Sequence, residues 1–464
     1  MSPVVYLAMF GWIPVVLYLF QQLPAQRAVI VSFITAWLFL PVASFVLPGI
    51  PDLTKMSATC YGILLATIIY DVGRFKLFRF GWLDLPMLIW CLCPFASSLS
   101  NDLGPYDGFS EALKQTVTWG LPYFLGRIYL NNLVGLRQLA IGIFVGGLIY
   151  VPLCLFEVRM SPQLHRIVYG AYARAGQFAQ AFRYGGWRPT VFMNHGLQVA
   201  FWMMATALIG ICLWKTGVLK ELWTIRVKWL ISALLMTVLL LKSTGVWILF
   251  GVGLVILFIA WQLRTAFTIV FLIGCMFIYL YQNTLTETYV TDQIISSLQE
   301  IISPERIESL EFRFNSEELL ADHARDRIIF GWGGWQRSLV FDDFGRRLAT
   351  QDSLWIIAFG TNGLVGLVSL YLSMLLPSMI LVLRFQEGSW SKRETSPAAV
   401  LALVVTLYMM DGLLNAMINP IFALTCGGIS GLMMVEKKSL KSNRTSSSLS
   451  TRLTPVHQNH YRNS

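Results

Sequence analysis

Apolar stretches long enough to cross a lipid bilayer recur along almost the whole chain, and they restrict the fold more than any other feature. A bilayer core is about 30 Å thick, and an α-helix needs roughly 20 apolar residues to cross it. Apolar residues make up 56% of the 464 residues and charged residues only 13%, which is much less charge than soluble domains carry. We therefore expect an all-α polytopic membrane protein.

We expect about 12–13 transmembrane helices in a domain formed by residues 1–435. The predicted spans are 4–20, 28–47, 56–72, 80–98, 110–130, 133–155, 192–214, 228–242, 244–261, 265–281, 362–383, 398–416 and 419–435. Only Lys242-Ser243 separates the eighth span from the ninth. The first span lacks the basic start and the cleavage site of a signal peptide, so we expect it to be retained.

Lysine and arginine gather in alternate connections between these spans, for example 74–79, 215–228 and 384–393. Connections with such an excess normally face the cytoplasm. The pattern predicts a cytoplasmic C-terminus, with residues 436–464 as a disordered basic tail that is rich in Ser, Thr and Asn. The basic residues mark membrane orientation and do not cluster on a soluble face, so the net charge of +10 predicts no nucleic-acid partner.

Two connections, 157–191 and 282–352, are far longer than the others, and both fall on the predicted outer side. In the second, Ser303-Pro304-Glu305 places a capping residue, a proline and an acid where a helix begins. Ser316-Glu317-Glu318 predicts the start of another helix, which ends at Arg325 and Arg327. We therefore expect the second loop to form a helical extracytoplasmic cap.

The end of this cap is predicted from glycine positions. The run Gly331-Trp332-Gly333-Gly334-Trp335 predicts a tight turn. Residues 353–383 would form a single helix about 46 Å long, too long for the membrane core, and Gly360 and Asn362-Gly363 divide them. We expect a short interfacial helix at 353–359, with Asp352 at its N-cap, followed by a crossing helix at 362–383.

Both outer loops carry arginine and no lysine, whereas the cytoplasmic connections use both residues. A guanidinium binds phosphate or carboxylate through two parallel hydrogen bonds, so this bias indicates an anionic ligand such as a lipid diphosphate headgroup. The alternative is that the arginines pair with acids of their own loop. That alternative fits the second loop, with seven arginines and thirteen acids, better than the first, with five arginines and Glu157 as its only acid.

Several polar residues in these loops have two readings. His195, at the start of the seventh span, is either a hydrogen-bonded structural residue or a ligand. His323 and Arg327 are four residues apart on one helix and face the same way. Asp352 is either a plain helix cap or a carboxylate base. Asp342-Asp343 is typical of metal-dependent sugar transferases, but solvated surface is the commoner reading, and we expect no metal.

Glu111, Lys114 and Arg127 lie on the fifth predicted span, and Asp411 lies on the twelfth. Charges inside a membrane are rare and often functional. Glu111 and Lys114 are spaced to pair, whereas the sequence names no partner for Asp411. The sequence contains no glycine-rich nucleotide loop or dinucleotide fingerprint, so we expect no cofactor.

Several short motifs follow one another in a specific order. They are Gly186-Trp187-Arg188-Pro189 through His195-Gly196, Ala321-Asp322-His323-Ala324-Arg325, Phe330-Gly331-Trp332-Gly333-Gly334-Trp335, Gln351-Asp352-Ser353 and Gly363-Leu364-Val365-Gly366. In this order they resemble the O-antigen polymerase and ligase family of bacterial surface polysaccharide assembly. The likeness covers the C-terminal half of the chain, and the first half resembles the family only in its helix layout.

This resemblance implies a metal-independent glycosyltransferase of the cytoplasmic (inner) membrane that transfers an undecaprenyl-diphosphate-linked glycan on the outer face. It implies that Arg188, with Arg325 or Arg327, grips the diphosphate. Asp352 or His323 would accept the proton of the acceptor hydroxyl. Further candidate site residues are His195, Arg313 and Arg337. Ligases of the family place His-Asn where this chain has Asp352-Ser353, which favours a polymerase.

Other readings stay open. They are a ligase that transfers to a lipid acceptor, a transporter (flippase) for lipid-linked sugars, and a receptor-like scaffold. A transporter normally binds its anion at midmembrane on broken helices, whereas these arginines lie in outer loops. The expected partners are a polyprenyl-diphosphate-linked glycan, the lipid bilayer and a chain-length regulator protein.

Overall fold

The computed structural model describes residues 2–174, 181–183, 185–265, 267–286, 304–334, 336–385 and 390–434. In these ranges, seven helical segments are long and apolar enough to cross a membrane. They are α1 (Pro3–Gln22), Trp82–Ser100, which contains α5 (Leu85–Ser100), α8 (Leu133–Met160), α10 (Gly196–Lys215), α12 (Thr244–Gln262), α13 (Phe267–Leu285) and α16 (Leu354–Arg384). The chain is therefore an α-helical multi-pass membrane protein.

Five shorter apolar helices accompany them: α2 (Ala25–Phe39), α3 (Lys55–Tyr70), α11 (Val227–Leu240), α17 (Ser396–Asp411) and a final helix, Pro420–Met434. The remaining helical elements are α4 (Gly73–Leu77), a 3-10 turn (Trp82–Asp84), α6 (Pro105–Gln115), a π turn (Thr116–Gly120), α7 (Leu121–Tyr129), α9 (Leu164–Tyr169) and α15 (Pro304–Arg325). The described ranges also contain three two-stranded hairpins: β1 (Phe45–Leu47) with β2 (Ile50–Leu53), β3 (Phe182–Arg183) with β4 (Gly186–Trp187), and β5 (Glu221–Leu222) with β6 (Ile225–Arg226).

Every predicted span contains a helix. The division at Lys242-Ser243 is confirmed, because α11 ends at Leu240 and α12 begins at Thr244. The first long loop begins later than predicted, since Glu157 lies inside α8. The predicted tail, 436–464, lies outside the described residues.

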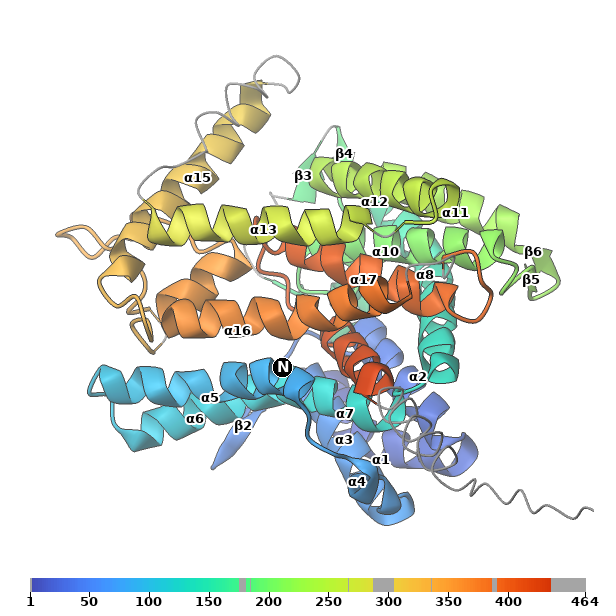
Figure 1. The fold of residues 1–464 in the computed structure, drawn as a ribbon, viewed down its shortest axis with the longest axis horizontal. Coiled ribbons are helices and arrows are strands. Elements are labelled where there is room, and N and C mark those ends of the chain that lie inside the picture. The colour runs from blue at the N-terminus through green and yellow to red at the C-terminus, as the bar shows by residue number, and fades with distance from the viewer. Residues whose placement is uncertain are drawn as a thin grey trace, which may run out of the picture.

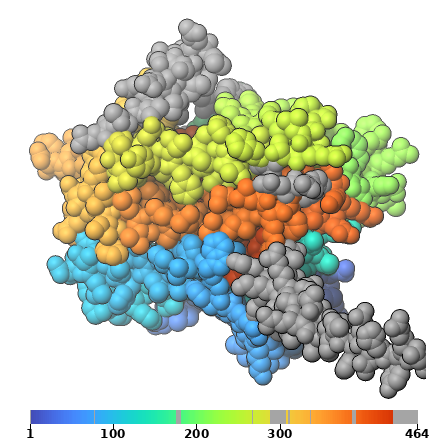
Figure 2. Space-filling model, in the orientation of Figure 1, coloured from blue at the N-terminus to red at the C-terminus, as the bar shows by residue number. Residues whose placement is uncertain are grey.

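The helices pack in layers around α16. Figure 1 shows α5, α16 and α13 running side by side, with α15 extending away from one end of this layer. In the space-filling view the orange band that contains α16 lies between the yellow-green band of α12 and α13 and the blue band of α5 (Figure 2). This arrangement buries the start of α16, which the site depends on.

α16 is broken where the glycines predicted a division. Gly363 has φ 64° and ψ −164°, so the run contains two helical pieces with a kink between them. A left-handed φ favours glycine, and a Cβ here would lie 2.3 Å from the carbonyl oxygen of Ile329. Inside a membrane, backbone groups freed by a break need new partners, and a segment that precedes α16 in the chain supplies them.

Residues 328–333 pair with the broken stretch of α16. The amides of Trp332 and Gly333 donate to the carbonyl oxygens of Gly360 (2.9 Å) and Thr361 (3.0 Å). In the other direction, Leu364 N donates to Ile328 O at 2.8 Å. The predicted turn therefore also supplies hydrogen-bond partners for the backbone groups freed at the break in α16.

Two predictions about the second long loop are wrong in detail. Residues 304–325 form one helix, α15, so no new helix starts at Ser316, and the predicted cap Ser303 lies outside the described residues. The Glu317 carboxylate does not face a helix start, because it accepts hydrogen bonds from the Ser353 and Tyr279 hydroxyls. At the start of α16 the N-cap is Ser353, one residue after Asp352.

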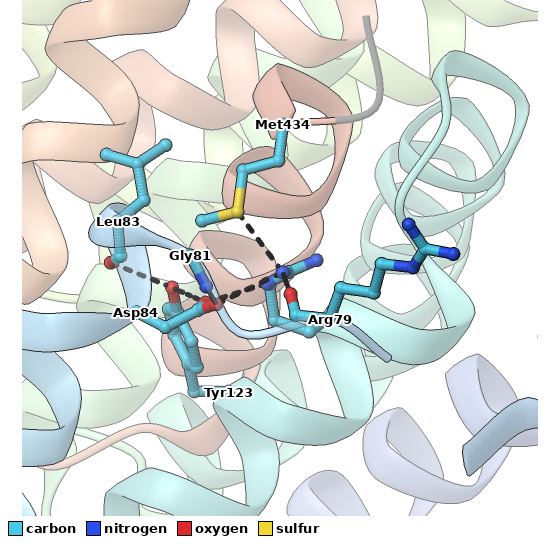
Figure 3. A network of polar contacts seen from close by, with 7 residues as sticks. Arg79, Gly81, Leu83, Asp84, Tyr123 and Met434 are labelled. Carbon is cyan, nitrogen blue, oxygen red and sulfur yellow. Dashed lines mark hydrogen bonds and ion pairs between the residues drawn. The ribbon is translucent and has the colours of Figure 1, made fainter. Parts of the chain in front are cut away.

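The charges predicted within spans have defined partners. Glu111 and Lys114 form the expected ion pair at 3.4 Å on exposed α6. Arg127 makes a two-point ion pair with Asp84, with Nε to Oδ1 at 2.7 Å and Nη2 to Oδ2 at 3.1 Å. Figure 3 shows the surrounding network, in which the Tyr123 hydroxyl also donates to Asp84. This pair joins the start of α5 to α7.

Candidate functional site

Residues from both long loops line a cavity of about 370 Å³, which we call the arginine cavity. Its lining residues are Arg174, Arg183, Arg188, His195, Leu197, Phe312, Arg313, Thr350, Asp352, Asn415 and Met417. They come from the first loop, the start of α10, the middle of α15, the residues before α16 and the segment after α17. Four arginines and, among the described lining residues, a single acid give the cavity an excess of positive charge.

Arg188 reaches the cavity because a tight hairpin precedes it. β3 and β4 are joined through Gly185, whose φ of 67° suits glycine. The Arg188 amide donates to Ala181 O at 2.7 Å, and its Nη2 donates to Lys242 O at 3.0 Å. Its side chain then crosses the first residue of α10, where a Cβ on Gly196 would lie 2.5 Å from Arg188 Cδ. Gly185 is therefore favoured by its left-handed φ, and Gly196 by the close approach of the Arg188 side chain.

His195 is the N-cap of α10, a hydrogen-bonded position at the helix start, and its side chain also lines the cavity. Its Nδ1 accepts a hydrogen bond from Leu197 N at 3.1 Å. Burial, followed by repulsion from Arg188 and the other cavity arginines, lowers the pKa of His195 to about 4. The ring is therefore neutral near pH 7, with its proton on Nε2, because Nδ1 serves as the acceptor. His195 can therefore act on a ligand as a hydrogen-bond donor through Nε2.

Arg313 is held by the segment that follows α17. Its Nη1 donates to Leu414 O at 3.1 Å and to Asn415 Oδ1 at 3.3 Å. Asn415 Nδ2 donates to Asp411 Oδ1 at 2.9 Å. Asn415 is therefore the partner that the sequence could not name for Asp411, and these bonds fix the orientation of its amide between a guanidinium and a carboxylate.

Asp352 lies at the edge of the cavity on a segment that is anchored on both sides. The preceding Gln351 donates to Ser338 Oγ at 2.9 Å, and the Ser353 hydroxyl donates to Glu317. Burial is the main cause that raises the pKa of Glu317 to about 7. Leu354 N donates to Gly412 O at 2.9 Å, which ties α16 to the end of α17. The residues on both sides of Asp352 are therefore held by hydrogen bonds, while Asp352 itself lines the cavity.

Four other predicted site residues do not line this cavity. Arg325 donates to the carbonyl oxygens of Asn283, Thr284 and Thr286 and pairs with Asp322, which joins the ends of α13 and α15. The His323 ring stacks on Trp332 with 4.4 Å between ring centroids. Arg327 lies over the same Trp332 ring at 5.4 Å. His323 Nε2 lies 3.1 Å from the carbonyl oxygen of Arg337, so these residues form a separate cluster.

The structure thus brings together Arg188, His195, Arg313 and Asp352 from the predicted set. It adds Arg174 and Arg183, whose signal in the sequence was the excess of arginine over acid in the first loop. Asn415 gave no such signal, because a lone asparagine near a helix end is common. Within the described ranges, no group of three His, Cys, Asp or Glu residues could hold a metal ion.

No family model matches the chain, and no curated protein matches it.

Proposed function

We propose that this protein polymerises polyprenyl-diphosphate-linked oligosaccharide repeat units by glycosyl transfer on the outer face of the cytoplasmic membrane. The observation that carries the proposal is the arginine cavity, where four guanidinium groups surround a space with one carboxylate at its edge. A volume of about 370 Å³ is in the range of small-molecule sites. It accommodates a diphosphate together with the sugar attached to it.

Arginine is well suited to such a ligand. It stays charged at every physiological pH and presents its N–H groups as a planar fork that matches phosphate oxygens. During transfer, the bond between the sugar C1 and the diphosphate oxygen breaks, and its electron pair stays on that oxygen. Arg188 and Arg313, which are already oriented by backbone and amide acceptors, would stabilise the added negative charge without further rearrangement.

The acceptor hydroxyl must lose a proton as its oxygen bonds to C1. Asp352 is the described lining residue suited to accept this proton. His195 already uses Nδ1 for the helix cap and would instead donate from Nε2 to a phosphate or sugar oxygen. The likeness to the polymerase and ligase family implies inversion at C1, and Asp352-Ser353 in place of His-Asn favours polymerisation over ligation.

The topology belongs to the same proposal. Charge distribution predicts that both long loops lie on one side of the membrane, and both contribute residues to one cavity. We place this cavity outside, the C-terminus in the cytoplasm and 12–13 helices across the bilayer. The donor glycan and a chain-length regulator protein would then meet the enzyme at its outer face.

The test uses the full chain in lipid nanodiscs with a polyprenyl-diphosphate oligosaccharide, with product length read on a gel. Removing one transition-state donor typically slows catalysis by roughly 10²–10³-fold, so we expect this loss in Arg188→Ala and Arg313→Ala. The matched control is Arg346→Ala, which removes an exposed arginine paired with Asp342 and should keep full activity. Wild-type chain lengths in both cavity variants would contradict the proposal, and lipid movement without elongation would favour a transporter.

A further inference from the structure

We propose that Glu157 is a positioning residue, whose buried carboxylate holds the turn at Thr190–Val191 so that Arg188 and His195 face the same cavity. Glu157 lies in the last turn of α8 and has no exposed surface. It is not among the residues that line the arginine cavity. Its effect on the ligand would therefore pass through the turn.

The carboxylate is occupied by backbone amides on both of its oxygens. Oε2 accepts from Thr190 N at 2.9 Å and from Val191 N at 2.7 Å. Oε1 accepts from Leu164 N at 2.8 Å, at the start of α9. Hydrogen bonds to a charged group are roughly twice as strong as those between neutral groups. One side chain of α8 thus fixes two separate parts of the first outer loop.

The turn at Thr190–Val191 needs these hydrogen bonds because its backbone is strained. Val191 has φ 51°, a left-handed conformation that is a clear outlier for a β-branched residue. Strained residues of this kind persist only where their surroundings hold them. Val191 is fully buried, and the next residue is also anchored, since Phe192 N donates to the Tyr150 hydroxyl at 3.1 Å.

The position of this turn links it to the ligand. Arg188 lies two residues before Thr190, and His195 lies four residues after Val191. Both side chains line the cavity, and the Arg188 side chain passes over Gly196. If Val191 relaxed to an ordinary φ, the chain direction between Arg188 and His195 would change, and the two groups would no longer point into one space.

The meaning of this inference for catalysis rests on the proposed function, so the experiment has two independent readouts. The first is hydrogen exchange of the peptide that contains residues 190–193 in the purified full-length protein. The second is binding of inorganic pyrophosphate as the probe. Glu157→Met keeps the side-chain length and removes both acceptors. Glu111→Met is the matched control, because it makes the same change at an acid on exposed α6.

We expect Glu157→Met to speed exchange in this peptide by roughly tenfold to a hundredfold, the range for lost hydrogen bonds to a charged group, and to weaken pyrophosphate binding at least tenfold. Glycine adopts a left-handed φ without penalty, so Val191→Gly in the Glu157→Met background should restore part of the lost binding. Rescue by glycine separates positioning from a general loss of folding.

The results that overturn the inference are distinct. Unchanged exchange in Glu157→Met, or no recovery of binding with Val191→Gly, removes the positioning role. If the wild-type protein does not bind pyrophosphate, the proposed function fails, while the exchange data still decide whether Glu157 holds the turn.

Discussion

The ion pair between Arg127 and Asp84 predicts an asymmetric loss of stability when either partner is replaced. Their side chains are only 6% and 5% exposed. Breaking a buried pair by removing one partner typically costs about 3–5 kcal/mol, because the remaining charge is stranded. The cost depends on which charge is left behind, and the network in Figure 3 indicates which loss is larger.

In Arg127→Met the remaining carboxylate keeps two donors, the Tyr123 hydroxyl and Gly81 N, each at 2.9 Å from an Asp84 oxygen. In Asp84→Asn the guanidinium keeps its charge, since arginine is not deprotonated in proteins. We therefore expect Asp84→Asn to cost about 4–5 kcal/mol and Arg127→Met about 2–3 kcal/mol, with the double variant well below their sum.

The measurement is denaturant unfolding of the detergent-purified protein, followed by tryptophan fluorescence. The exposed pair of Glu111 and Lys114 supplies the control, because their side chains are 36% and 62% exposed. Breaking that pair should change the free energy of unfolding by less than about 1 kcal/mol. Equal costs for the two pairs, or a double variant equal to the sum of its singles, would refute the reasoning.

Three further changes test other parts of the structure. Gly196→Ala puts a Cβ 2.5 Å from Arg188 Cδ. Pyrophosphate affinity should therefore fall roughly tenfold, similar to the loss of one charge-assisted hydrogen bond, with little change in melting temperature. Unchanged affinity would mean that Arg188 does not contact the ligand. Gly427→Ala brings a Cβ to 1.9 Å from a backbone oxygen of α7, so the free energy of unfolding should fall by about 3 kcal/mol. The control is Gly11→Ala, which has open space around it and should be nearly neutral. Equal effects of the two changes would contradict the close contact at Gly427. The pKa of Glu317 is raised from 4.5 to about 7, so its contribution to stability is full below pH 4.5 and is lost as pH rises through about 7. Across that window wild-type stability should fall by roughly 3 kcal/mol more than that of Glu317→Gln, at about 1.4 kcal/mol per pKa unit. Parallel pH curves would contradict this.

The sequence predicted the helical membrane domain because span length and apolar content are properties of single segments. It also located the break in α16, since Gly363 is both a poor helix residue and the residue that a left-handed φ favours. It misjudged residues 304–325, where Ser316-Glu317-Glu318 has the composition of a helix start but lies within one helix. Local propensity is a weak guide when tertiary contacts, here with Ser353 and Tyr279, decide the role of an acid.

The candidate site shows a similar limit. Arg188, His195, Arg313 and Asp352 lie together, although His195 and Arg313 were only further candidates. Arg325 was predicted to bind the diphosphate together with Arg188, but its guanidinium binds three carbonyl oxygens near the end of α13. Whether an arginine meets a ligand or a carbonyl depends on segments far away along the chain. No local pattern carries that information.

The balance of arginines and acids in each loop did indicate which arginines line the cavity. The physical reason lies in what the acids bind. The acid counted with the first loop, Glu157, lies in the last turn of α8, and both of its carboxylate oxygens accept from backbone amides. The first loop's arginines at 174, 183 and 188 converge on the cavity, where the second loop adds Arg313 and Asp352. In the second loop, acids such as Asp322 and Asp342 do pair with neighbouring arginines on the same loop. An excess of arginine in a loop therefore indicates a ligand site only where the nearby acid is already hydrogen-bonded to backbone amides. In this protein that acid is Glu157, and the turn that it holds is the one that positions Arg188.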